Sequence, residues 1–249
     1  NTSSVLTTNL AQPTFNGGNF VVGNDESRSI VGSAIQVYSS GSSVSPFVLS
    51  DITLTGTGNG CQGNAGGRPT IWAEKSFIEI ENAEISSGDF GIGLWSSAGS
   101  VTNSEVNVNC NGIDINGKKS IGSTFFGFEI SGNQITTQQR SGIYASSGAY
   151  ATLTNNDIQG ASESSGIVVY SSDLFIHNNN IGPIGGYNGL WLGGSFDVIA
   201  ENNTIFETAG TPIVAGWYTN SLASASRVSL ANNTISYDGT GACSSNTYW

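Results

Sequence analysis

A short asparagine-rich motif recurs along the 249-residue chain, and its spacing is the feature that most restricts the fold. Each copy ends a polar turn with one apolar residue, as in Asn155-Asn156-Asp157-Ile158. The closing apolar residues of the eight copies are Ile52, Ile85, Val106, Ile135, Ile158, Ile181, Ile205 and Ile235. The shorter intervals between them are 21 to 24 residues and the longer ones 29 to 33 residues. A base period of this length, with insertions, predicts a solenoid that carries surface loops.

Two further apolar segments keep phase with this motif. Residues 112–115 (Gly-Ile-Asp-Ile) exemplify one, and residues 77–80 (Phe-Ile-Glu-Ile) the other. Their alternation is typical of short β-strands, which Gly, Asn and Ser turns separate. Three strands per repeat predict an all-β fold, a right-handed single-stranded parallel β-helix of about eight to nine coils. We expect this β-helix to form one domain that spans residues 1–249. A leucine-rich repeat would need a helical segment per repeat, which the sequence lacks.

The leading asparagine of each motif is expected to point inward. An asparagine repeated at one place in every coil can stack in a ladder, in which each side-chain amide bonds the next. Asn202 and Asn232 both begin N-x-Thr sequons, and a buried ladder amide could not accept a glycan. We therefore expect neither to be glycosylated. Asn1 begins a third sequon and is expected to be the accessible one, so that the chain is a candidate glycoprotein.

The charge balance argues against several classes of partner. The chain has 7 Lys and Arg against 18 Asp and Glu, a net charge of -11, which argues against nucleic acid. The same charge argues against an anionic membrane surface, and no apolar run approaches the roughly 20 residues of a membrane span. The chain begins at Asn1 and contains no Met, from which we expect a mature, secreted, extracellular protein. We also expect a monomer.

Three cysteines and one histidine set the expectations for disulfides and metals. An odd cysteine count favours one disulfide and one free thiol, and we prefer Cys61–Cys110 to either pairing with Cys243. No CxxC pair occurs, and His177 is the only histidine, which argues against a zinc site of Cys and His. We name no residue as a metal ligand.

The Gly-Ile-x-Ile strand followed by an Asn-x-x-Ile turn resembles the repeat of the pectin-lyase-like parallel β-helix superfamily, over nearly the whole chain. Members of that superfamily are mostly polysaccharide lyases, glycoside hydrolases and sugar epimerases, and some bind carbohydrate without catalysis. The resemblance implies a polysaccharide partner, and a substrate cleft along the strand column that begins at Ala34-Ile35. The repeat specifies the fold rather than the reaction.

Three insertions, residues 55–69, 117–127 and 218–226, border the strand column in which the cleft is expected. Loops that interrupt a regular repeat often serve function. Alternation within the column predicts which side chains face outward, and many of them are aromatic. Exposed aromatic rings can stack on the apolar faces of sugars. The residues predicted to bind substrate are Trp72, Glu74, Trp95, Tyr144, Tyr170 and Trp191.

Five of the seven basic residues border the same column, which favours an acidic polysaccharide. A lyase that acts on uronic-acid polymers must neutralise the sugar carboxylate and remove the proton at C5. We predict Lys118 or Lys119 as the base and Arg140 as the neutralising group. Asp114 would orient a lysine or bind a cation. A bound Ca²⁺ is an alternative means of neutralisation.

The spacing from Lys119 to Arg140 resembles that between base and acid in calcium-assisted alginate and chondroitin lyases of this fold, and residues 115–120 resemble their I-x-x-x-K-S segment. Two positions depart from that pattern, since Arg140 precedes its strand and Gly112 replaces an acidic calcium ligand. A glycoside hydrolase would need two carboxylates about 5–9.5 Å apart. The candidates for that pair are Glu74, Asp89 and Asp114. A lyase is our leading interpretation, with a hydrolase and a non-catalytic glycan-binding protein as alternatives.

Overall fold

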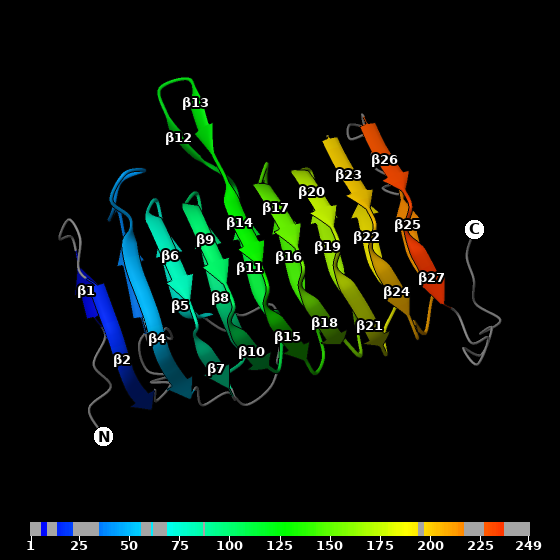
Figure 1. Cartoon of the computed structure of the whole chain (residues 1–249), viewed down its shortest axis with the longest axis horizontal. Coiled ribbons are helices and arrows are strands. Elements are labelled where there is room, and N and C mark those ends of the chain that lie inside the picture. Colours follow the sequence, from blue (N-terminus) through cyan, green and yellow to red (C-terminus); the bar gives the residue numbers. More distant parts are fainter. Residues whose placement is uncertain are drawn as a thin grey trace.

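The computed structural model describes residues 35–55, 61, 69–86, 88–193, 197–216 and 227–236, and the backbone of two earlier strands, β1 (Leu6–Thr8) and β2 (Thr14–Val21). The elements of these residues are strands, which lie side by side in one elongated stack (Figure 1). A typical coil contributes one strand to a first sheet, sheet A, and two strands to a second, sheet B. The predicted all-β parallel β-helix is confirmed.

Sheet A has nine strands, each parallel to its neighbours. After β1 they are β3 (Ile35–Tyr38), β5 (Pro69–Glu74), β8 (Phe90–Trp95), β11 (Ile113–Asn116), β16 (Ile143–Ser146), β19 (Ile167–Tyr170), β22 (Leu190–Gly193) and β25 (Ile213–Ala215). Ile92 pairs with Ile113, and Ile113 with Ile143, in the register that the Gly-Ile segments predict. These isoleucines are fully buried, and burial of one such side chain contributes about 1.5–3 kcal/mol.

Sheet B has sixteen strands and consists of two arms that meet at the asparagine-rich turn. One strand, β4 (Phe47–Thr55), runs through both arms and also pairs with β2. The first arm continues with β6 (Phe77–Glu81), β9 (Ala98–Thr102), β14 (Phe128–Ser131), β17 (Tyr150–Thr154), β20 (Asp173–His177), β23 (Asp197–Glu201) and β26 (Arg227–Ala231). The second continues with β7 (Glu84–Ser86), β10 (Glu105–Val108), β15 (Gln134–Thr137), β18 (Asp157–Gly160), β21 (Asn180–Ile184), β24 (Thr204–Phe206) and β27 (Thr234–Ser236).

A chain of hydrogen-bonded asparagines crosses five coils, buried in the first four and half-buried in the fifth, but the second residue of each motif forms it. Its members are Asn133, Asn156, Asn179, Asn203 and Asn233. The Nδ2 of each of the first four donates to the Oδ1 of the next at 2.9–3.0 Å. Each of the five also donates to a backbone carbonyl at 2.9 Å. The prediction that the leading asparagine is buried was wrong.

The leading asparagine forms the turn itself. Asn155, Asn178 and Asn202 have φ of 54°, 56° and 55°, the left-handed conformation that asparagine tolerates better than most residues. The turn directs this side chain into solvent and returns the next residue to the interior. Asn202 and Asn232 are therefore exposed, so the prediction that burial prevents their glycosylation was also wrong. Asn1 lies outside the described residues.

The first repeat is shifted by two residues from the alignment that the sequence suggested. Leu54, rather than Ile52, pairs with Ile85. Asp51 takes the left-handed turn position, with a φ of 52° against 51° for Asn82. Ile52 then occupies the inward position that asparagine holds in later coils, where it is buried with 1% of its surface exposed. An apolar residue can replace the ladder amide because it leaves no polar side-chain group to satisfy.

Two of the three predicted insertions meet sheet A at opposite ends of its strands. Residues 117–127 follow the carboxyl end of β11 and form a hairpin of β12 (Lys119–Ile121) and β13 (Thr124–Phe126), which projects from the stack (Figure 1). The loop before β5 enters at the amino end, and its Cys61 forms a disulfide with Cys110, as preferred from the sequence. Cys243 and residues 218–226 lie outside the described residues.

Candidate functional site

The outward face of sheet A carries the aromatic side chains that alternation predicted. One row, in register across neighbouring strands, reads Gln36, Trp72, Gly93, Asp114, Tyr144, Val168, Trp191 and Val214. A second row, two residues further along each strand, includes Glu74, Trp95, Asn116 and Ser146, and then Tyr170 beside Gly193. We call this surface the sheet A face. The predicted positions of all six substrate-binding candidates in these rows are confirmed.

A tryptophan pair marks one half of the sheet A face. The ring centroids of Trp72 and Trp95 are 4.7 Å apart, with an angle of 37° between the ring planes. Gly93 makes this arrangement available, since a Cβ atom there would overlap the rings of Trp95 and Pro69. Both tryptophans remain half-buried, so part of each ring faces solvent. The missing side chain at position 93 therefore allows Trp95 to lie across the sheet.

A group of three rings marks the other half. Tyr144 and Tyr170 have ring centroids 5.7 Å apart, and Tyr170 meets Trp191 edge to face at 4.5 Å. Val168 lies between Tyr144 and Trp191 in the first row, with only 2% of its surface exposed. All three rings are half-buried, as the tryptophans are. Aromatic surface held in place by its neighbours loses little conformational entropy when a ligand stacks on it.

Asp114 lies between the two aromatic groups, in register with Gly93 on one side and Tyr144 on the other. Burial raises the pKa of its carboxyl to about 6, while a hydrogen bond with the Asn111 side chain acts in the opposite direction. Asn111 is itself positioned, because its Oδ1 accepts a hydrogen bond from the Ser141 backbone N–H at 3.2 Å. The carboxyl can therefore hold or release a proton near neutral pH, in the middle of the sheet A face.

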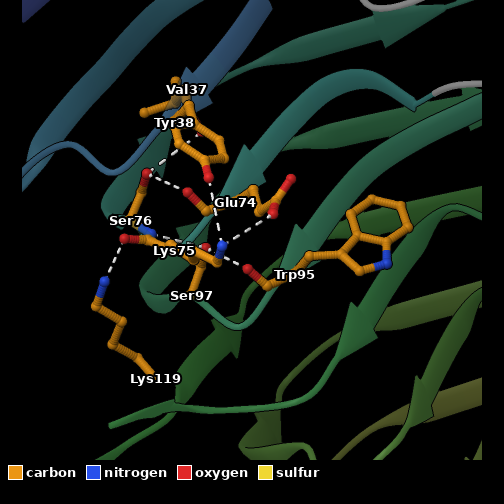
Figure 2. Close-up of polar contacts among 8 residues, drawn as sticks. All are labelled: Val37, Tyr38, Glu74, Lys75, Ser76, Trp95, Ser97 and Lys119. Carbon is orange, nitrogen blue, oxygen red and sulfur yellow. Dashed lines mark hydrogen bonds and ion pairs between the residues drawn. The ribbon is translucent and has the colours of Figure 1, made fainter. Parts of the chain in front are cut away.

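All three lysines of the chain gather at the carboxyl end of these strands. In Figure 2, the Nζ of Lys75 lies 3.3 Å from the Tyr38 hydroxyl and 3.8 Å from Glu74 Oε1. The Nζ of Lys119 donates to the backbone carbonyl of Lys75. Lys118 contacts the outer hairpin, with its Nζ 4.0 Å from the centroid of the Phe125 ring. We call Lys75, Lys118 and Lys119 the lysine corner.

The lysine corner contains one cation whose charge is held firmly and one whose charge is easier to lose. The hydrogen bond with Tyr38, followed by the charges of Tyr38 and Glu74, raises the pKa of Lys75. Burial, followed by repulsion from Lys75, lowers the pKa of Lys119. The base of the hairpin is fixed over this region, because Phe126 meets Phe77 edge to face at 5.2 Å and Lys119 Nζ lies 5.5 Å from the Phe77 ring.

The residues predicted to catalyse β-elimination do not come together. Arg140 precedes β16 at its amino end, whereas Lys118 and Lys119 follow β11 at its carboxyl end. Because β11 and β16 run parallel and in register, these groups lie at opposite ends of sheet A. The ion pairs of the described residues are Lys75–Glu74 and Arg227–Asp197, so none joins Asp114 to a lysine there. The sequence spacing of Lys119 and Arg140 therefore does not correspond to proximity in the structure.

Sequence reasoning assigned no role to Gly93, Asn111 or Tyr38. Gly93 could be noticed only by its place in the outward row, since a glycine gives no sign that a neighbouring ring covers it. Asn111 acts across a turn on Asp114, which no strand alternation describes. Cys110, beside Asn111, ties this turn to the loop at Cys61.

The described residues contain neither a cluster of metal-ligand side chains nor a membrane-spanning helix. Among them, no group of three or more His, Cys, Asp and Glu side chains is arranged to hold a metal ion. In that same part of the chain, no helix has the length and apolar character needed to cross a membrane.

Comparison with known families decides the classification of this fold. The family described as "Right handed beta helix region" matches residues 122–248, which is 127 of the 249 residues. The chain belongs to the right-handed β-helix family. A second family, described as "Periplasmic copper-binding protein (NosD)", matches residues 17–184 of this β-helix protein. No curated protein sequence matches it significantly.

Solved structures similar to this β-helix protein include the periplasmic alginate epimerase AlgG, at a TM-score of 0.46 and 10% identity over 93% of this chain and 74% of that one. The mannuronan C-5 epimerase AlgE6 A-module of Azotobacter vinelandii has a TM-score of 0.44 and 14% identity, over 91% of this chain and 78% of that one. Tailspike protein 3 of bacteriophage CBA120 has a TM-score of 0.36 and 8% identity, over 96% of this chain and 54% of that one. Likeness at this level carries no argument about function.

Proposed function

We propose that this β-helix protein binds a polysaccharide along the sheet A face, with the glycan crossing the strands. The observation that carries the proposal is the pair of aromatic groups, Trp72 with Trp95 and Tyr144 with Tyr170 and Trp191, on one face of one sheet. Sugar rings present apolar C–H surfaces that stack on such rings. A row of aromatic side chains that remain partly open to solvent fits a ligand surface better than a folding core.

The length of the face predicts the length of the ligand. From β5 to β22 there are five strand-to-strand steps, which span about 24 Å at about 4.8 Å each. One step is comparable with the length of one pyranose unit, so an extended glycan would meet about one strand per sugar. A ligand of one or two sugars would reach a single aromatic group. We therefore expect affinity to rise with chain length until both groups are covered.

Binding to a graded series of oligosaccharides, measured by calorimetry, tests this proposal. Trp95→Ala and Trp191→Ala should each weaken binding of a long oligosaccharide about tenfold, since a stacking contact is worth up to about 1.4 kcal/mol. Tyr150→Ala is the matched control, because Tyr150 is an exposed aromatic residue of β17, in sheet B. Equal losses in all three variants, or affinity independent of glycan length, would contradict the proposal.

We further propose that the bound polysaccharide is cleaved, with Asp114 as the proton-transferring group. A carboxyl with a pKa of about 6, between two sugar-stacking groups, is poised for acid or base catalysis near neutral pH. Glu74, the nearest carboxylate of the outward rows, lies two strands and two residues away, about 12 Å between Cα atoms. Glu74 is engaged with Lys75 rather than with Asp114. We therefore propose β-elimination of an acidic glycan ahead of hydrolysis.

The lysine corner supplies the positive charge that such a glycan would need. Lys119, whose pKa is lowered, is the lysine best suited to accept a proton, while Lys75 keeps its charge. A polysaccharide panel distinguishes the alternatives. Unsaturated-sugar absorbance with polyuronates indicates a lyase, new reducing ends without that absorbance indicate a hydrolase, and binding without turnover indicates a glycan-binding protein. If Asp114→Asn keeps full turnover, Asp114 is not the proton-transferring group.

The disulfide indicates the cellular compartment in which the protein folds. The Cys61–Cys110 disulfide is typical of proteins that fold outside the reducing cytoplasm. We propose an extracytoplasmic location, consistent with the word "periplasmic" in the description of the second matching family. Secretion into the medium is a narrower proposal, and fractionation of cells that produce the full chain would test it.

A further inference from the structure

We propose that Asn202 and Asn232 are acceptor sites for N-linked glycans. In each asparagine turn, the inward amide belongs to the second residue of the motif. The leading residues, Asn202 and Asn232, have φ of 55° and 53° and exposed side chains. The turn thus buries Asn203 and leaves the amide of the residue before it in solvent.

The hydroxyl residue of each sequon is exposed on the same side. Thr204 and Thr234 begin β24 and β27, pair with one another in register, and face solvent. Between each acceptor asparagine and its threonine stands one inward ladder residue. The left-handed turn therefore presents both polar groups of an N-x-Thr sequon outward, although the residue between them is part of the ladder.

The reaction needs a co-reactant, a lipid-linked oligosaccharide diphosphate, and an oligosaccharide-transferring enzyme. The side-chain amide nitrogen forms a bond to C1 of the first sugar and loses one proton. The bond between C1 and the diphosphate oxygen breaks, and the lipid diphosphate leaves. The product is a bulky, hydrated group on the surface of the chain.

The position of these sites separates them from the sheet A face. The asparagine turn joins the two arms of sheet B, so it is the corner of the coil that sheet A does not touch. Asn202 and Asn232 belong to neighbouring coils, since the Asn202 backbone N–H donates to the Ala231 carbonyl at 3.0 Å. Two glycans here would stand side by side at one strand spacing, near the last described coil, and leave polysaccharide binding unaffected.

The same turn provides matched controls within the chain. Asn155 and Asn178 have the same left-handed φ and the same exposure, but the residue two positions later is Asp157 or Asn180 instead of threonine. They share the geometry of the turn without the hydroxyl. Glycosylation governed by the sequon should therefore ignore these two asparagines.

The test is the intact mass of the full chain, secreted from a eukaryotic host, before and after an amidase that removes Asn-linked glycans. All proteins carry Asn1→Gln so that the third sequon is silent. We expect two glycans on this parent, one fewer in Asn202→Gln or Asn232→Gln, and no change in Asn155→Gln or Asn178→Gln. Thr204→Ala and Thr234→Ala, which keep the turn asparagines, should match the corresponding Gln variants.

Asp157→Thr extends the test, because it gives Asn155 a sequon in the same turn. It should add one glycan if the turn geometry accepts modification generally. A parent whose mass is unchanged by the amidase while circular dichroism shows a folded β-rich protein would overturn the proposal. Loss of a glycan in the Asn155→Gln or Asn178→Gln control would overturn it as well, because neither residue begins a sequon.

Discussion

The asparagine turn and the sheet A face belong to the same coils, yet they obey different rules. At the turn, one residue type occupies the inward position in five successive coils, from Asn133 to Asn233. On the sheet A face, consecutive strands present Trp72, then Gly93, then Asp114. A buried amide must have every hydrogen bond satisfied, so an asparagine at this position depends on a matching partner in the next coil. An outward position has no such requirement, and its side chains can vary to suit a ligand.

The largest effect is expected at the ladder. Asn156→Ala removes a side chain whose Nδ2 donates to Ile130 and Asn179 and whose Oδ1 accepts from Asn133. It leaves the buried Asn133 backbone N–H without its acceptor, at about 1–3 kcal/mol, and removes three further side-chain hydrogen bonds, at about 0.5–1.5 kcal/mol each. We expect the free energy of unfolding to fall by about 4 kcal/mol. Denaturant unfolding followed by circular dichroism measures it.

Asn155→Gly is the control, because the exposed neighbour forms no part of the ladder and glycine adopts its φ of 54° without strain. Its unfolding midpoint should stay close to that of the parent. Equal destabilisation in both variants would show that the turn, rather than the buried amide, limits stability.

The fold could be predicted because its determinants are periodic. Strand number per coil, the inward isoleucines and the register of sheet A all follow from residues that repeat, such as Ile113 and Ile143. The choice between Asn155 and Asn156 for the ladder could not be made, because a pair of identical residues carries no signal of which one turns the chain. Asp51 misled the alignment for a related reason, since the left-handed turn position accepts aspartate as well as asparagine.

The second prediction concerns Asp114 and sharpens the contrast between stability and function on the sheet A face. The folded state raises its pKa from 3.8 to about 6, so folding favours the protonated carboxyl. Between pH 3.8 and 6 the folded state binds more protons than the unfolded state, and stability from this group falls as pH rises. The shift corresponds to about 3 kcal/mol. Asp114→Asn should therefore stabilise the protein by up to this amount at pH 8, and by almost nothing at pH 3.

Thermal unfolding of the parent and of Asp114→Asn across pH 3 to 8 measures this effect. The unfolding temperatures of the two proteins should coincide at low pH and diverge as the pH rises from 3.8 to about 6. Loss of turnover together with this gain in stability would identify a group retained for chemistry at a structural cost. Parallel curves at all pH values would show that the carboxyl is not desolvated.

The site was less predictable than the fold, because its parts depend on contacts between coils. Alternation predicted that Trp95 and Tyr170 face outward. It did not predict which neighbouring ring each of them contacts. Lys119 and Arg140 border the same sheet, yet position along a strand separates them. A residue that is near a sheet A strand in sequence can lie at either the amino end or the carboxyl end of that strand. The two ends are far apart in the structure.

The third prediction tests how the sheet A face is shaped. Gly93→Ala places a Cβ where the Trp95 ring lies, so the ring must move away from Trp72. We expect binding of a long oligosaccharide to weaken about tenfold, as in Trp95→Ala. Gly185→Ala is the control, because a Cβ there has its nearest neighbour at 3.5 Å, an ordinary contact. Unchanged binding in Gly93→Ala would separate the tryptophan pair from the glycan site.

The smallest effect is expected at the lysine corner. Lys119→Gln removes one of its charges, and an exposed ion pair contributes about 0.2–1 kcal/mol, so affinity for an acidic oligosaccharide should fall about threefold. The loss should vanish in high salt, which screens such contacts, and should be absent for a neutral glycan of the same length. Arg227→Gln changes the net charge equally, but Arg227 pairs with Asp197 on sheet B. Equal weakening in both variants would mean that acidic ligands sense the net charge of -11 and not a local site. Weakening in Lys119→Gln alone would place the acidic group of the ligand at the carboxyl end of sheet A, beside Trp95 and Glu74.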